Sequence, residues 1–329
     1  MKAIKILTMA ALATAVFASC SNDEDLAQSN YPMDNVVRIM TSVDGMNTRA
    51  SYGNSTDKLN SFGFCIKNAN SETYTYDNVK VTKEGSNWNP ATQMLWQNST
   101  TAVDILAYAP YQETTEDANG KVNVFGKTDY AFSVKEDQSN AEDYSSDLIV
   151  YKKTGFKPES DLNTNQAVDV TFTHLLSQLN LTIELRDQFN QDEKKPVTSA
   201  TVTDVKVDGT FIRSKVNFAA DPISFLRDGQ ASAAITPETV AFKKADKTTD
   251  HATFKYSAIV IPQKVIAGQL CIKFKVDGTD YIWTGTSDVE FVSGKKYDLL
   301  LLVGKDVVQV KGITATPWGK ETIIEKETD

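Results

Sequence analysis

Residues 36–50 read VVRIMTSVDGMNTRA, a predicted β-strand followed by a turn and an accessible basic peptide bond. Alternate residues of the strand share one face: Val37, Ile39, Thr41 and Val43. Asp44-Gly45 supplies turn residues that end the strand. The bond between Arg49 and Ala50 then lies among small polar residues, where a trypsin-like protease can reach it. Two interpretations stay open: an ordinary first strand with a loop, or a strand that proteolysis removes from a sheet.

The size and charge of the chain exclude some classes of function. A chain of 329 residues has room for two domains of ordinary size, and a hydrophobic fraction of 41% is sufficient for a packed core. The formal net charge of -9 argues against a nucleic-acid partner, which would require a basic face. It also argues against electrostatic docking on anionic lipid.

Residues 1–19 have the features of a secretion signal. Lys2 and Lys5 form a basic start, and the apolar run from Ile6 to Phe17 is too short to span a bilayer. The residues 17–20, Phe-Ala-Ser-Cys, resemble a bacterial lipobox, in which Cys20 becomes the lipidated first residue. The alternative is an ordinary signal peptide that is cut near Ala18.

An acidic run follows this cysteine, residues 21–25, Ser-Asn-Asp-Glu-Asp. Such a run can be a solvated tether. It also resembles the signal that exports lipoproteins of Bacteroidales to the outer face of the outer membrane. We therefore expect residues 20–49 to form a tether that ends in the first strand.

The rest of the chain consists of short apolar runs separated by Gly, Asn, Asp, Ser and Thr, and no segment keeps a helical period beyond a turn or two. This pattern is typical of β-sandwiches and barrels. Residues 152–166 lack periodicity, so we predict a linker there and an all-β fold of two domains, residues 50–160 and 161–329. Asp208-Gly209 and Asp277-Gly278 predict hairpin turns.

The sequence lacks the nucleotide, metalloprotease and serine-hydrolase motifs, so we expect no enzyme and no cofactor. His174 is interpreted as a structural corner residue that bonds to backbone. A polar loop carries four carboxylates: Asp137, Glu142, Asp143 and Asp147. Their spacing does not fit an EF-hand, so we predict no metal site, with a calcium loop as the alternative.

Two further cysteines and four tryptophans need an interpretation. Cys65 and Cys271 both lie in strand-like runs, so free thiols are expected and a disulfide is the alternative. Trp96 and Trp283 are expected in the core. For the other two tryptophans, Trp88 and Trp318, an aromatic platform that binds sugar stays open as an interpretation.

Several motifs occur in a fixed order along the chain. They begin with the lipobox at Cys20 and with Thr48-Arg49-Ala50 after the first strand. The later motifs are Trp96 before VDILAYAP (103–110), DLI (147–149), FTHLLSQL (172–179), IPQ (261–263), GKKY (294–297) and the segment 313–318. Together these motifs resemble the fimbrillin-like (Mfa-like) family, the type V pilins of Bacteroidales. The chain departs from the family pattern at Phe17, where Leu is more usual in a lipobox.

The resemblance implies two transthyretin-like β-sandwich domains in tandem. It also implies a lipidated precursor on the outer membrane surface, which an arginine-specific protease cuts after Arg49 to free the segment from Cys20 to Arg49. The mature protein would join other fimbrial subunits in an extracellular fimbrium, as a stalk or tip subunit. A strand near the C-terminus would be donated to a neighbouring subunit, with these residues at its contacts: Val308, Val310, Ile313, Trp318 and Ile323.

The physics of sheets is consistent with this route, because a sandwich without one strand exposes two sheet edges and a slot in its core. A strand from another chain can fill both by β-strand addition, and a head-to-tail contact of this kind builds a filament. The alternative is a monomeric surface lipoprotein that binds glycans or host ligands through its aromatic residues. A secreted hydrolase is a third possibility, without a recognisable site.

Overall fold

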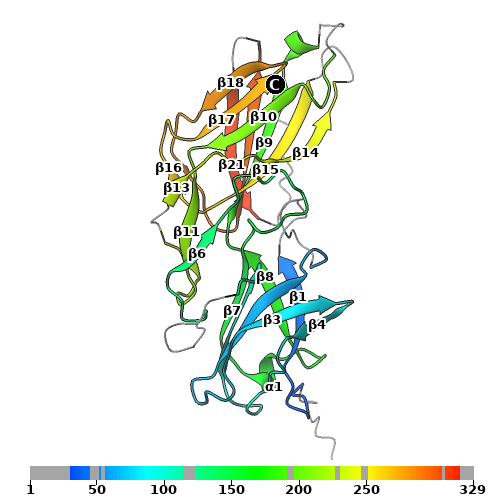
Figure 1. The fold of residues 1–329 in the computed structure, drawn as a ribbon, viewed down its shortest axis with the longest axis vertical. Helices are drawn as coiled ribbons and strands as arrows, with labels where there is room; N and C mark the ends of the chain where they lie inside the picture. Colours follow the sequence, from blue (N-terminus) through cyan, green and yellow to red (C-terminus); the bar gives the residue numbers. More distant parts are fainter. Residues whose placement is uncertain are drawn as a thin grey trace, which may run out of the picture.

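The computed structural model describes residues 30–44, 52, 56–113, 124–190, 196–226, 230–245, 251–305 and 308–318. Within these residues strands dominate, and the helical segments are single turns, α1 (Pro158–Asp161) and a 3₁₀ turn (Asp187–Phe189). No helix among them has the length and apolar character needed to cross a membrane. The all-β prediction is confirmed, and Figure 1 shows the strands in two bodies stacked along the long axis.

The first body is built on one seven-stranded sheet in the order β1-β8-β7-β5-β2-β3-β4. Its strands are β1 (Arg38–Asp44), β2 (Ser61–Lys67), β3 (Tyr76–Glu84), β4 (Asn87–Pro90), β5 (Val103–Ala109), β7 (Ile149–Phe156) and β8 (Ala167–His174). The two ends of this order approach each other, because Val36 forms an isolated antiparallel bridge with Leu95. The Val37 amide donates to the Met94 carbonyl at 2.9 Å, so the sheet is nearly closed on itself.

An aromatic core fills the inside of this curved sheet. Phe62 lies at its centre, with ring centroids 5.3 Å from Phe172 and 5.1 Å from Trp88. Trp96 stacks on Phe156 at 5.6 Å, which places it in the core as predicted. Phe172 follows Val168 and Val170 along one face of β8, so the alternation of apolar residues is what directs β8 into this core.

Replacing Phe172 by alanine should reduce the free energy of unfolding by roughly 3–5 kcal/mol, because the side chain is fully buried and its loss leaves a cavity against Phe62. Urea denaturation of the chain without residues 1–20 measures this loss. Phe211→Ala is the matched control, since that ring is 40% exposed and its removal should cost much less. Equal losses in the two variants would contradict the core assignment.

The second body contains four smaller sheets. Their strand orders are β14-β15-β9-β20-β21, β10-β17-β18, β12-β11-β13 with β6 on β11, and β16-β19. The strands are β6 (Tyr130–Ser133), β9 (Ser177–Leu185), β10 (Val202–Asp208), β11 (Phe211–Asn217), β12 (Ser224–Phe225), β13 (Gln230–Ser232), β14 (Glu238–Lys243), β15 (Ala252–Val260), β16 (Lys264–Val265), β17 (Cys271–Val276), β18 (Thr279–Thr284), β19 (Val289–Glu290), β20 (Lys295–Val303) and β21 (Val308–Pro317). Their apolar faces share a second core, separate from the first.

The two Asp-Gly signals have different outcomes. Asp277-Gly278 joins β17 to β18 in a tight hairpin, with φ angles of 49° and 82° that suit this turn. Asp208-Gly209 joins β10 to β11, and these strands belong to different sheets, so the hairpin prediction is wrong there. Gly209 has a φ of 90°, and a Cβ atom on it would lie 1.9 Å from the Gln269 carbonyl oxygen, which makes glycine necessary at this crossing.

The sheets do not divide at the predicted boundary between residues 160 and 161. β8 (Ala167–His174) pairs within the first sheet, and β6 (Tyr130–Ser133) pairs with β11 in the second body. The predicted linker at residues 152–166 contains the end of β7 and the helical turn α1. The corner at residues 174–178 is where the chain passes from the first sheet to β9, although the predicted boundary places these residues within the second domain.

Candidate assembly interface

β1 is an edge strand of the first sheet and pairs in parallel with β8, from Arg38 opposite Ala167 to Asp44 opposite Thr173. Of the four residues predicted on its inner face, Val37 just before β1, Ile39 and Val43 are buried, and Thr41 is half-buried. At the start of the strand, Arg38 pairs with Asp34 at 2.6 Å, and its hydrogen bond lowers the pKa of the Asp34 carboxyl. The pair is exposed, so it orients the strand and contributes little stability.

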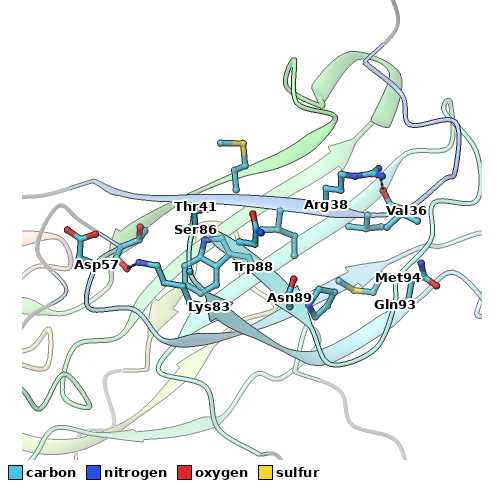
Figure 2. Close-up of a pocket in the computed structure, with 17 residues that line it drawn as sticks. Val36, Arg38, Thr41, Asp57, Lys83, Ser86, Trp88, Asn89, Gln93 and Met94 are labelled. Atoms are coloured by element: carbon cyan, nitrogen blue, oxygen red, sulfur yellow. Dashed lines mark hydrogen bonds between the residues drawn. The ribbon is translucent and has the colours of Figure 1, made fainter.

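A groove of about 1020 Å³ runs along the other edge of β1, between this strand and β4. Figure 2 shows the groove with Arg38 and Thr41 on the β1 side and with Lys83, Trp88 and Asn89 on the opposite side. In the described part of the chain, β1 therefore has one strand partner, β8. The other edge of β1 is bonded at the start of the strand, where Val36 bridges Leu95 and the Val37 amide donates to Met94, so departure of β1 would break one full ladder and this short bridge.

β8 in turn depends on β1 for most of its backbone pairing. Its contact with β7 is limited to His174 opposite Ile149 and Thr173 opposite Val150. In the described part of the chain, the residues of β8 from Ala167 to Phe172 pair with β1. Loss of β1 would consequently expose the backbone edge of β8 and the apolar side chains that Val37, Ile39 and Val43 cover.

Cys20, Arg49 and Ala50 lie outside the described residues. The segment that contains Arg49 starts where β1 ends, at Asp44, and reaches a buried residue at Tyr52. The Tyr52 amide donates to Asp147 Oδ2 at 2.9 Å, and its ring lies 5.6 Å from that of Tyr144. Burial and the nearby Asp147 carboxylate raise the pKa of Tyr52. The chain is thus anchored in the first body on both sides of the predicted cleavage position.

The predicted donor segment forms β21, the last strand of the five-stranded sheet, which pairs antiparallel with β20. Its side chains are weakly covered: Val310 is 43% exposed, and Val308 and Ile313 are half-buried. A register shift opposite Leu300 and Leu301 interrupts the alternation of β21. Trp318, directly after the strand, is buried, and Ile323 lies outside the described residues.

A sequence model of the fimbrillin-like family matches residues 48–318. The chain belongs to the fimbrillin-like family. It is 26% identical over 317 residues to Fim1C of Bacteroides uniformis, which is assigned as a fimbrium subunit, and the alignment covers 92% of each chain.

Two solved structures have the same fold. The first is a protein of Bacteroides uniformis assigned to cell adhesion, with a TM-score of 0.56, 20% identity, and coverage of 87% of this chain and 99% of the other. The second is a protein of Bacteroides ovatus with the same assignment, a TM-score of 0.61, 14% identity, and coverage of 87% and 99%.

The limits of the family match coincide with two features of the structure. The match begins at residue 48, after β1 and next to Arg49, and ends at Trp318. β1 therefore lies outside the segment that the family model describes, although it completes the first sheet of this chain.

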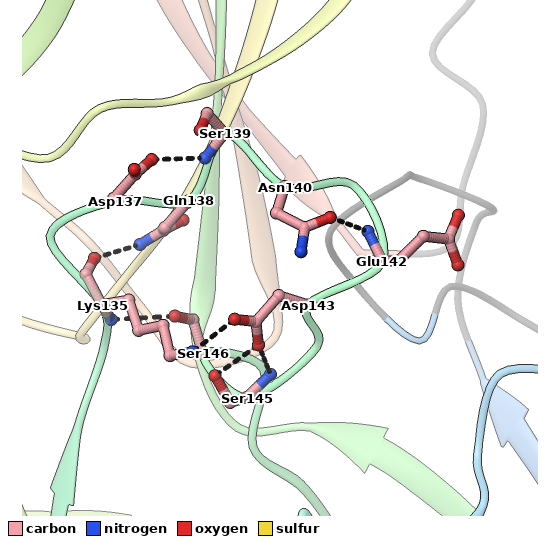
Figure 3. Close-up of polar contacts among 9 residues, drawn as sticks. All are labelled: Lys135, Asp137, Gln138, Ser139, Asn140, Glu142, Asp143, Ser145 and Ser146. Carbon is pink, nitrogen blue, oxygen red and sulfur yellow. Dashed lines mark hydrogen bonds and ion pairs between the residues drawn. The ribbon is translucent and has the colours of Figure 1, made fainter.

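The polar loop between β6 and β7 is bonded mainly within itself (Figure 3). The backbone amides of Ser139, Glu142 and Ser145 donate to side chains two residues before them, at 3.0–3.1 Å. Asp147 points elsewhere and is fully buried beside His174. Within the described ranges, no group of three or more histidine, cysteine, aspartate or glutamate residues could hold a metal ion.

The remaining predicted residues take these positions in the fimbrillin-like fold. Cys65 is buried, Cys271 is half-buried, and both are free thiols; burial raises the pKa of Cys65. Trp283 is buried in the second core as predicted, and Trp88 lines the groove beside β1. His174 Nδ1 lies 3.0 Å from Asp147 Oδ1, so this corner residue bonds a buried carboxylate, a partner that was not predicted from the sequence.

Three features were not predicted from the sequence: the burial of Tyr52, the bonding of Asp147 to Tyr52 and His174, and the parallel pairing of β1 with β8. The polar Asp147 directly before the apolar run Leu148–Val150 was the one available signal, since a carboxylate at the edge of a core requires a partner. No local signal identifies β8 as the partner of a strand about 130 residues earlier.

Proposed function

We propose that this fimbrillin-like chain is a structural or adhesive fimbrial subunit, of stalk or tip, that polymerises by strand exchange. It is exported as a surface lipoprotein anchored in the outer membrane through Cys20, and an arginine-specific protease cleaves it after Arg49. β1 then leaves, and the C-terminal strand β21 of a neighbouring subunit takes its place beside β8. The observation that carries this proposal is the edge position of β1, because a cut after Arg49 leaves this strand held by one full ladder with β8 and by the short bridge at Val36 and Val37, without covalent attachment to the rest of the sheet.

The energetics of the first sheet support a replacement strand. β1 and Val37 bury three apolar side chains, which corresponds to on the order of 5–9 kcal/mol of burial free energy. The parallel ladder with β8 adds backbone hydrogen bonds from Arg38 to Asp44. A mature subunit would recover both terms by binding a strand of similar length, and part of this gain offsets the ordering of that strand.

The positions of donor and acceptor support a filament. β21 belongs to the second body and β8 to the first, so exchange joins different surfaces of successive subunits (Figure 1). A heterologous contact of this kind does not close on itself unless the rotation happens to form a ring, and repetition gives an open polymer.

The alternative function is a monomeric surface lipoprotein that captures glycans. One observation favours it: the half-buried Trp88 ring lines the groove together with polar side chains such as Asn87 and Asn89. Aromatic rings with amide neighbours suit sugar binding. This function requires β1 to stay in place, since it forms one side of the groove, so the two functions predict opposite fates for the strand.

Limited trypsin digestion of the chain without residues 1–20 should cut at Arg49–Ala50, and large oligomers should form afterwards. β1 holds Arg38 in a ladder, which should slow cleavage there. Mass spectrometry identifies the cut, and size-exclusion chromatography with light scattering measures the assembly. Arg49→Ala is the control and should stay monomeric. A subunit that is cleanly cut after Arg49 and remains monomeric would favour the glycan-binding lipoprotein.

A further inference from the structure

β21 is a ten-residue strand whose side chains are weakly covered by its own subunit. It occupies the edge of its sheet, and β20 is its ladder partner. Most of its side chains are exposed, and Val308 and Ile313 contact the second core while remaining partly accessible. A strand with so few buried contacts is expected to open locally well below the free energy of global unfolding.

The buried anchor of this segment is Trp318, at the end of the strand. Its ring stacks on the imidazole of His174, with ring centroids 4.0 Å apart and the two planes at 3°. Its amide donates to the Gly294 carbonyl at 2.8 Å. The Trp318 side chain is thereby seated on the corner where the chain passes between the two bodies.

The seat itself is rigid. His174 and Asp147 have side chains that are almost completely buried, and the imidazole Nδ1 lies 3.0 Å from the Asp147 carboxylate. The other oxygen of Asp147 accepts the Tyr52 amide at 2.9 Å. A ring fixed by a buried carboxylate offers a constant flat surface, which is what parallel stacking of an indole requires.

The burial of Trp318 also carries a free-energy cost. Among the described residues, the indole Nε1 of Trp318 is buried without a hydrogen-bond partner. A buried donor without a partner loses part of the free energy that the burial of its ring provides. Departure of Trp318 would return this N–H to water, so the stack on His174 holds the strand reversibly.

From these contacts we infer that the stack of Trp318 on His174 is a clasp that retains the C-terminal strand in its own subunit before assembly. This inference deepens the proposed function, since it names what controls release of the donor strand. Release requires the indole to leave His174, after which the ladder with β20 can open from the Pro317 end. The clasp acts in the uncleaved precursor, so it can be tested without any polymer.

Hydrogen exchange of the uncleaved chain, followed by mass spectrometry, tests the clasp. Trp318→Ala should raise the exchange rate of the β21 amides roughly tenfold or more, because local opening becomes easier. Exchange in β1 and β8 should stay unchanged. Trp318→Phe keeps an aromatic ring over His174 and should restore most of the protection. Val310→Ala is the matched control, a truncation on the same strand at a side chain that is 43% exposed.

Two outcomes would overturn the inference. One is a Trp318→Ala variant whose β21 exchange equals that of Val310→Ala. The other is a uniform rise of exchange in β1, β8 and β21, which would make Trp318 an ordinary core residue. A selective rise in a chain that never polymerises after cleavage would leave the clasp standing and count against the proposed strand exchange alone.

Discussion

A disulfide between positions 42 and 171 should keep the cleaved subunit monomeric. Ser42 and Thr171 are register partners in the parallel ladder of β1 and β8, and both side chains are exposed. Their hydroxyl oxygens lie 3.1 Å apart, so cysteine side chains at these positions point at each other. Neighbouring strands hold Cα atoms at about the separation that a disulfide requires. The cross-link would retain β1 even after the chain is cut at Arg49.

The experiment uses Ser42→Cys/Thr171→Cys in the chain without residues 1–20, oxidised before digestion. Expected is a cleaved product whose fragments remain joined, monomeric by light scattering, which forms oligomers once a reductant is added. Ser42→Cys alone is the control and should assemble after cleavage like the original chain. Cys65 is buried and inert, whereas Cys271 is half-buried, so the double variant is best made with Cys271→Ser. Assembly of the oxidised, cleaved protein would rule out departure of β1 as the step that permits polymerisation.

Truncation after Gly304 should abolish assembly while the subunit remains folded. The deletion removes β21 and Trp318. β20 keeps its parallel ladder with β9, from Lys296 opposite Gln178 to Val303 opposite Leu185, so the second core retains its central strands. The weak coverage of β21 limits the loss of buried surface. Size-exclusion chromatography after trypsin cleavage should give a monomer, and circular dichroism should still give the spectrum of a folded β protein.

Mixing the truncated subunit with the full-length protein tests the same prediction more directly. A cleaved subunit without β21 has an empty acceptor site and no strand to donate, so it should shorten the polymers of the full-length protein in proportion to its share of the mixture. Trp318→Ala in a full-length chain keeps β21 and should still be incorporated. Filaments made from the truncated subunit alone would show that the donated strand comes from another part of the chain.

Local periodicity predicted individual strands well and their partners poorly. The alternation of Val37, Ile39 and Val43 identified the inner face of β1, because a period of two fixes which side chains a sheet buries. The same signal in Val168 and Phe172 does not say which sheet receives them, and β8 lies in the first body while we expected the second. Long-range pairing is decided by the packing of complete sheets, so it leaves no mark on either strand alone.

The sequence likewise indicated individual segments of the candidate interface and not the contacts between them. The resemblance located the cleavage position and the C-terminal segment, and their roles remain predictions. The stacking of Trp318 on His174 depends on the corner between the bodies and on Asp147, residues that lie far apart in sequence. The uneven exposure of Val310 and Ile313 depends on a register shift in β21, which sequence alternation alone does not indicate.

If β1 is removed as proposed, the reliance of residues 167–172 on this one strand partner would shorten the lifetime of the cleaved subunit. Once β1 has gone, residues 167–172, Ala-Val-Asp-Val-Thr-Phe, would present an unpaired edge rich in β-branched side chains, which is the hallmark of a segment prone to aggregate. A pool of cleaved subunits would then be lost to misassembly. Under the proposed route, the uncleaved chain would be the form that accumulates without misassembly, and proteolysis beside the growing end would control the supply of subunits, so that filament length should follow protease activity more closely than the amount of uncleaved chain.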